Sequence, residues 1–222
     1  MLAGDLSDTV IVLDLDDTLY PEEAYVRSGI TAVCALAAEL YGSDHTTKLL
    51  AQRDEGILDW LTALCTLLPQ APGLRESLLW RYRLHQPGIV LSPEARATVD
   101  DLIDRAMAVV ILTDGRSITQ RLKLRALGLA DLPVYISDEY AGACKPDPTR
   151  FLAIMADFPA ARHVYVADNP AKDFIAPKAL GWLTIGVRTG AAGVYRQDGP
   201  IPVAHAPDVW IPSIGDLFEA PR

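Results

Sequence analysis

The chain has 222 residues, of which 50% are hydrophobic and 22% charged, a composition typical of a folded globular protein rather than a disordered one. The formal net charge of -9 is not offset by any lysine- or arginine-rich run, so nucleic acid is not an expected partner. The three cysteines form no CxxC pair, and no apolar stretch is long enough to span a bilayer. With no signal peptide at the N-terminus, these features predict a cytoplasmic protein that is not attached to a membrane.

The first predicted element is a strand at residues 10–15, because a short apolar run rich in β-branched residues is typical of a strand buried on both faces. The strand ends in a turn sequence, Asp-Asp-Thr-Leu-Tyr-Pro, at residues 16–21. From Glu22 the apolar residues then recur at helical spacing, and we expect helices from residue 22, over 46–68 and over 74–84. The sequence therefore predicts an all-helical subdomain at residues 21–86.

Beyond Pro93 the pattern alternates between helix and strand. Ser92 is a suitable N-cap for a helix that begins near Pro93. Strands are expected at 108–112, 134–137, 163–167, 183–187 and 209–211, and helices at 94–106, 117–127, 148–158 and 172–180. The stretch 190–207 is a predicted loop, and a short helix is expected in the tail before residue 219. Such alternation with short links predicts an α/β fold: a Rossmann-like parallel sheet with helices on both faces, built from residues 1–20 and 87–222.

Polar side chains follow four of the predicted strands. The carboxyl ends of parallel strands meet at one edge of the sheet, where ligands bind, so these side chains should converge there. Carboxylates that crowd together repel one another unless a cation lies among them, and oxygen ligands of this kind suit Mg²⁺. The side chains concerned are Asp14, Asp16, Asp17, Thr18, Thr113, Asp114, Lys145, Asp168 and Asp173.

The same residues resemble the motifs of a known superfamily. The segment Asp14-Leu-Asp-Asp-Thr-Leu is similar to the DxDxT motif that opens the haloacid dehalogenase superfamily. Thr113 resembles its second motif, Lys145 its third, and the segment from Asp168 to Asp173 its fourth. The order matches, and the resemblance covers essentially the whole chain. It implies that residues 21–86 form a helical cap inserted after the first strand.

The resemblance also implies roles for the residues that match its motifs. Asp14 would be the nucleophile that forms an aspartyl-phosphate, and Asp16 would protonate the leaving oxygen and then activate water. Thr113 would bind phosphoryl oxygens, and Lys145 would offset negative charge on the nucleophile and the transferred group. The Mg²⁺ ligands that it implies are Asp14, Asp16 (through its main-chain carbonyl), Asp168 and Asp173.

Several of these assignments have open alternatives. Asp173 could act through a water molecule, hold Lys145, or simply suit the dipole of the helix that follows. Four further residues are candidates for substrate contact because they adjoin the motifs: Thr18, Asp114, Gly115 and Arg116. Arg116 is equally compatible with a plain surface arginine. The segment from Trp80 to His85 could contact substrate or could pack an aromatic face inside the cap.

Asp16 favours one reaction class over another. A halide leaves without a proton, so a dehalogenase needs no acid two positions after its nucleophile, whereas a phosphatase does. We therefore expect a Mg²⁺-dependent phosphomonoester hydrolase that acts on a small phosphorylated metabolite, either a sugar phosphate or a nucleotide, as a monomer or homodimer. The alternatives are a phosphomutase or dehalogenase on the same scaffold, or a non-catalytic binding module with the same fold.

Overall fold

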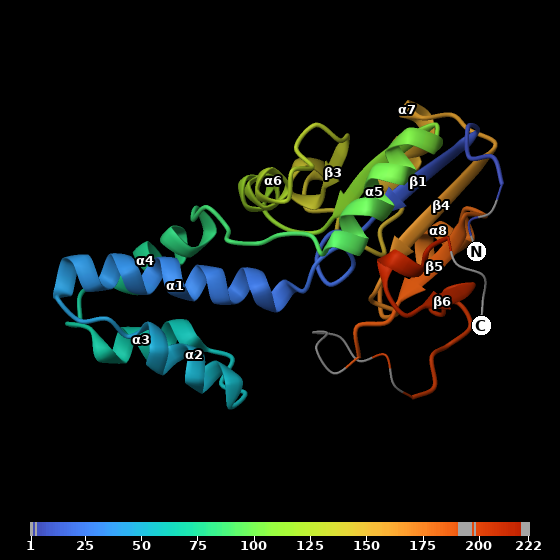
Figure 1. Ribbon diagram of the computed structural model, residues 1–222. Helices are drawn as coiled ribbons and strands as arrows, with labels where there is room; N and C mark the ends of the chain where they lie inside the picture. Colours follow the sequence, from blue (N-terminus) through green and yellow to red (C-terminus); the bar gives the residue numbers. More distant parts are fainter. Residues whose placement is uncertain (1, 3, 191–196, 198, 219–222) are drawn as a thin grey trace.

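The core of the protein is a six-stranded sheet in which every pair of neighbouring strands is parallel (Figure 1). The computed structural model describes residues 2, 4–190, 197 and 199–218. The strand order is β3-β2-β1-β4-β5-β6, with β1 in the interior. The strands are β1 (Thr9–Leu13), β2 (Ala108–Thr113), β3 (Val134–Ile136), β4 (Arg162–Ala167), β5 (Leu183–Val187) and β6 (Val209–Ile211). The predicted parallel sheet is confirmed.

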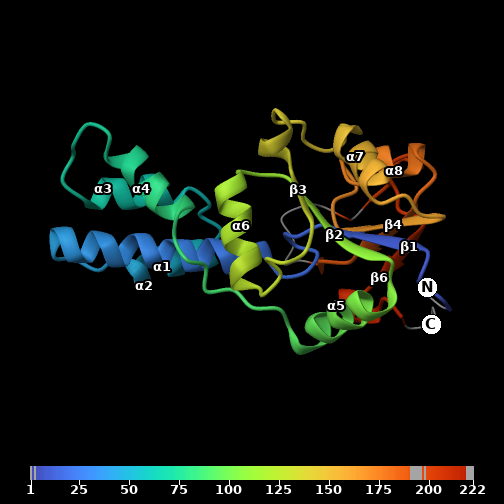
Figure 2. The ribbon, with the colours of Figure 1, turned by 90° about the horizontal axis from the view of Figure 1, so that it is seen from above.

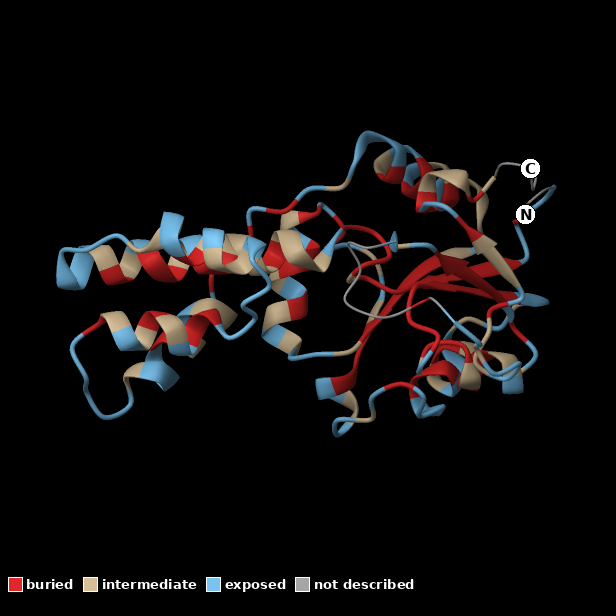
Figure 3. Ribbon diagram, turned by 90° about the horizontal axis from the view of Figure 1, so that it is seen from below, coloured by how far each residue is buried: buried red, intermediate tan, exposed pale blue. Residues whose placement is uncertain are grey.

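Helices cover both faces of this sheet because β1 is apolar on both. Ile11 and Leu13 point into one core, to which α5 (Pro93–Arg105) and α6 (Ser117–Ala126) contribute. Val10 and Val12 point into the opposite core, to which α7 (Thr149–Asp157) and α8 (Ile175–Ala179) contribute. Two short 3₁₀ helices, η1 (Ser137–Tyr140) and η3 (Ile214–Asp216), follow β3 and β6. Figure 3 shows the strands as the most deeply buried part of the chain, as expected for a Rossmann-like fold.

Four helices lie to one side of the sheet and share a core of their own (Figures 1 and 2). A Cβ atom at Gly29 would lie 2.2 Å from the ring of Tyr82, so the absence of a side chain lets the first helix approach the fourth. Their shared core includes the buried side chains of Ile30, Leu49 and Leu64. The helices are α1 (Glu22–Tyr41), α2 (Thr46–Asp54), α3 (Trp60–Leu67) and α4 (Leu74–Arg83).

The predicted helix at 46–68 is wrong in one respect, because it is two helices. The segment between α2 and α3 contains Gly56 with φ +89°, a conformation that ends a right-handed helix. Asp59 then caps the new helix by accepting a hydrogen bond from the main-chain N–H of Thr62 at 3.1 Å. Helical spacing alone did not reveal this break.

The C-terminal third differs from prediction mainly in its helix lengths. The helix expected at 172–180 begins only at Ile175, because Asp173 lies in the turn that follows β4 and accepts a hydrogen bond there from the main-chain N–H of Asn169. Part of the predicted loop at 190–207, namely 191–196 and 198, lies outside the described residues, as does residue 219.

Within the described part of the chain, no helix is long and apolar enough to cross a membrane.

Candidate active site

Asp14 occupies the first position after β1, where the sheet holds its backbone. Its main-chain N–H donates to the carbonyl of Val166 on β4 at 2.9 Å, which extends the pairing of the two strands by one residue. The carboxylate is buried, and its Oδ2 lies 2.8 Å from Nζ of Lys145. Burial raises the pKa of Asp14 to about 6, and the charge of Lys145 opposes that rise. A carboxylate fixed at a strand end and paired with a lysine suits a nucleophile.

Lys145 connects two carboxylates, those of Asp14 and Asp173. Its Nζ lies 2.8 Å from Oδ1 of Asp173 as well as 2.8 Å from Asp14, and it donates to the hydroxyl of Tyr165 at 3.0 Å. Burial alone would lower the pKa of this lysine, but Asp14 and Asp173 outweigh it and raise the pKa well above its ordinary value. Lys145 therefore stays charged and offsets part of the negative charge around it.

One lysine does not balance the acidic cluster. Carboxylate oxygens of Asp14, Asp168 and Asp173 lie within 4.8 Å of one another, and all three residues are buried. Asp168 Oδ1 accepts a hydrogen bond from Thr18 at 3.4 Å, whereas its buried Oδ2 has no hydrogen-bond partner among the described residues. Burial, followed by repulsion from Asp14 and Asp173, raises the pKa of Asp168 to about 8. An all-oxygen set short of positive charge fits a hard divalent cation.

The carboxylate of Asp16 faces α6. Both of its oxygens accept from Nζ of Lys123, at 2.7 and 2.8 Å, and Oδ2 also accepts from Nε2 of Gln120 at 3.1 Å. The hydroxyl of Tyr20 donates to Oδ1. Burial and the charge of Asp16 both raise the pKa of Tyr20, which keeps its proton and remains a donor. Asp16 still lines the cleft, with 21% of its side chain exposed.

The last residue of β2 and the two residues after it also line the cleft. The Thr113 hydroxyl accepts from Nε2 of Gln120 at 2.6 Å. Asp114 binds Nζ of Lys172 at 2.8 Å and the guanidinium of Arg150, and these cations together with Lys145 outweigh burial and lower its pKa. The fully buried Arg150 also donates to the carbonyl of Thr113 at 2.8 Å. Asp114 is thus held in place by cations from two other segments.

Most of the predicted site residues line a single cleft of about 410 Å³. It contains Lys172 and Glu22, which the sequence analysis did not single out, and burial, followed by repulsion from Asp16, raises the pKa of Glu22 to about 7. The predicted residues that line it are Asp14, Asp16, Thr113, Asp114, Gly115, Lys145 and Asp168. The predicted metal ligand Asp173 lies directly beneath, fully buried.

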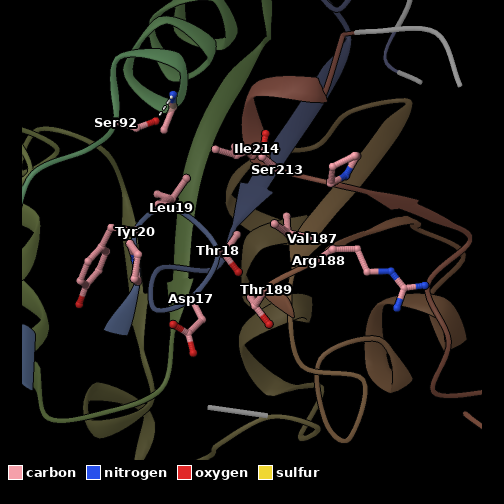
Figure 4. A pocket seen from close by; sticks show the side chains of 13 residues that line it. Asp17, Thr18, Leu19, Tyr20, Ser92, Val187, Arg188, Thr189, Ser213 and Ile214 are labelled. Atoms are coloured by element: carbon pink, nitrogen blue, oxygen red, sulfur yellow. Dashed lines mark hydrogen bonds between the residues drawn. The ribbon is translucent and has the colours of Figure 1, made fainter. Parts of the chain in front are cut away.

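Two of the predicted substrate-contact residues lie elsewhere. Thr18 lines a neighbouring pocket of about 300 Å³ that the loop after β1 helps to form, together with Val187, Thr189 and Ile214 (Figure 4). Arg116 lines a third pocket with Trp80, and its guanidinium lies 5.8 Å from the centre of the indole ring. Thr18 is connected to the cleft by its hydrogen bond to Asp168. Substrate contact by these residues stays a prediction.

The comparison with protein-family models covers most of the molecule just described. Residues 9–181 match the model for haloacid dehalogenase-like hydrolases. The chain belongs to this family. It is therefore an enzyme of the hydrolase type, and the matched range contains all four predicted motifs.

Relatives and solved structures agree with that assignment. The haloacid dehalogenase-like chain is 28% identical over 202 residues to ribulose-1,5-bisphosphate 5-phosphatase of Halopiger xanaduensis, covering 80% of this chain and 83% of the relative. It is 37% identical over 134 residues to phosphoserine phosphatase of Thermus thermophilus, covering 59% and 51% of the two chains. Its fold matches the magnesium-bound hydrolase YfnB of Bacillus subtilis with a TM-score of 0.65 at 20% identity, covering 95% and 96%.

The sequence did not predict one amide and three cationic side chains of this haloacid dehalogenase-like site: Gln120, Lys123, Arg150 and Lys172. Lys172 lies inside the fourth motif, so its position offered a signal. Gln120 and Lys123 are three residues apart on one face of α6, beside the buried Leu124, and a polar pair on an otherwise buried helical face could have been noticed. No local pattern marks Arg150.

Proposed function

We propose that this hydrolase is a Mg²⁺-dependent phosphomonoesterase that works through an aspartyl-phosphate on Asp14. The observation that carries the proposal is the Asp14–Lys145 pair at 2.8 Å, set beside Asp168 and Asp173 with a second acid, Asp16, two residues along the chain. Two relatives are named as phosphatases, which supports the same reaction class. The presence of Asp16 argues against dehalogenation, because a departing halide needs no proton.

The proposed reaction has two steps. In the first, an oxygen of Asp14 attacks phosphorus and the bond to the leaving oxygen breaks. That oxygen takes the proton carried by Asp16, which becomes the carboxylate that accepts from Lys123 and Gln120. In the second, Asp16 takes a proton from a water molecule that attacks phosphorus, the bond to Asp14 breaks, and inorganic phosphate leaves. Lys145 and Lys172 would offset negative charge at the cleft, and the Thr113 hydroxyl, which lines it, would bind a phosphoryl oxygen.

The acidic cluster is the proposed site for Mg²⁺. Asp14, Asp168 and Asp173 would hold the ion, together with the main-chain carbonyl of Asp16. Bound Mg²⁺ would reduce the repulsion between the nucleophilic carboxylate and the phosphate. The Oδ2 of Asp168, which lacks a hydrogen-bond partner among the residues that the structure describes, supports this assignment because a buried carboxylate oxygen normally has a partner.

The substrate that we propose is a small phosphorylated metabolite, either a sugar phosphate or a nucleotide. The named substrate of the Halopiger relative is a sugar bisphosphate, which supports the first of these. Residues 21–86 would act as a cap over the core of residues 1–20 and 87–222, and closure would exclude bulk water from the cleft. The three unpaired cysteines support a cytoplasmic location, and a monomer or homodimer would suffice.

Release of inorganic phosphate from a panel of phosphorylated metabolites, with Mg²⁺ present, tests the proposal. Turnover should disappear with EDTA and in Asp14→Asn, while the exposed control Asp131→Asn keeps wild-type activity. Formation of an isomer without phosphate would indicate a mutase, and halide release from haloacids a dehalogenase. A folded, Mg²⁺-binding protein that gives none of these three products would support a binding module instead.

A further inference from the structure

The side chain of Asp16 lines the cleft, yet both of its carboxylate oxygens are hydrogen-bonded to other side chains. Each of its two oxygens accepts from Lys123 and from one further side chain, Gln120 or Tyr20. These donors come from two segments, α6 and the loop after β1, so the carboxylate has a defined orientation. A carboxylate that moves protons benefits from this, because transfer requires alignment with the reacting oxygen.

Helix packing alone does not explain a buried lysine at position 123, because burying its charge costs free energy. Its side chain is 4% exposed, and its Nζ lies 4.2 Å from the centre of the Tyr25 ring on α1. Removing an ammonium group from water costs several kcal/mol, and an apolar residue of similar length commonly packs as well or better. Lys123 forms an ion pair with Asp16, and its charge also acts on Glu22; both carboxylates line the cleft, which indicates a role at this site.

Gln120 connects Asp16 to the group expected to bind phosphate. Its Nε2 donates to Oδ2 of Asp16 at 3.1 Å and to Oγ1 of Thr113 at 2.6 Å. Its side chain also lies against Gly115, where an added Cβ would meet it at 3.2 Å. The amide thus connects the second acid to the Thr113 hydroxyl through one donor nitrogen.

From these contacts we infer that Lys123 and Gln120 are positioning residues that align Asp16 for proton transfer to the leaving oxygen. The inference rests on the proposed function, in which Asp16 donates that proton as the phosphorus–oxygen bond breaks. The two side chains exchange no proton themselves. Their removal would leave the attack of Asp14 intact and would impair the reaction in proportion to the leaving oxygen's need for a proton.

This dependence on the leaving group separates positioning from a merely structural role. The measurement is kcat/KM for a series that runs from p-nitrophenyl phosphate, whose leaving group needs little protonation, to alkyl phosphates, which need it fully. General acid catalysis contributes about 10²–10⁴-fold, so Lys123→Met should lose at least about 100-fold on alkyl phosphates and under about 10-fold on p-nitrophenyl phosphate. Gln120→Met should show the same trend, and Lys123→Arg should restore part of the loss.

Two reference variants make the outcome decisive. Asp16→Asn should show the same steep dependence, and Arg125→Met, on the exposed side of α6, should match the wild type. The positioning role alone would be overturned if Lys123→Met and Gln120→Met lost kcat/KM equally on every substrate while the loss in Asp16→Asn still depended steeply on the leaving group. An equal loss in Asp16→Asn would instead overturn the proposed role of Asp16. If Lys123→Met is unfolded by circular dichroism, Gln120→Met decides.

Discussion

Replacing Arg150 by methionine should destabilise the fold because this side chain connects three segments of the site. Its guanidinium, fully buried on α7, donates to the carbonyls of Ala143 at 2.9 Å and Thr113 at 2.8 Å and pairs with Asp114. Methionine fills similar space but leaves these acceptors without their donor. Removing one partner of a buried ion pair costs about 3–5 kcal/mol. Because Lys172 still binds the other oxygen of Asp114 at 2.8 Å, we expect a loss near 3 kcal/mol.

Urea unfolding followed by circular dichroism measures this loss as a change in the free energy of unfolding. The matched control is Arg125→Met, an exposed arginine, which should change stability by no more than about 0.5 kcal/mol. A double-mutant cycle with Asp114→Asn should give a coupling energy above about 1 kcal/mol. A loss below about 1 kcal/mol in Arg150→Met would refute the reasoning, since the buried acceptors would then have found other donors.

Two further predictions concern the metal site and pH. Mg²⁺ at 100 times its dissociation constant should stabilise the wild type by about 2.7 kcal/mol in thermal melts; Asp168→Asn should gain far less, and an equal gain would contradict the proposed ligand set. Burial lowers the pKa of His85, whose ring contacts Tyr82 and Ser28, so the unfolded chain binds a proton more readily. Stability should therefore be lost as the pH falls below about 6.5, and the urea midpoint of His85→Gln should fall less than that of the wild type.

The sequence alone was sufficient for the sheet and for most of the cleft, because both depend on local patterns. A β-branched run such as residues 10–13 is buried on both faces wherever it lies in a parallel sheet. Asp14, Thr113 and Asp168 each end or follow a strand, and parallel strands bring their carboxyl ends to one edge. Chain order therefore predicted which side chains would meet, and the family match agrees with that order.

Packing between distant segments decided what local patterns did not contain. The break between α2 and α3 follows from a left-handed Gly56, whereas the surrounding apolar spacing is compatible with one continuous helix. Arg116 was grouped with the cleft by its proximity in sequence, and the structure places it beside Trp80 in another pocket.

The partners of Asp16 show the same distinction at the candidate active site. The sequence by itself determined that two acids stand two residues apart after a buried strand. Only the tertiary structure decided that Asp16 binds Lys123, 107 residues away, and Asp114 binds Arg150, 36 residues away. The physical reason is that strand ends are positioned by a repeating backbone geometry, whereas a buried cation is positioned by the particular carboxylate that offsets its charge.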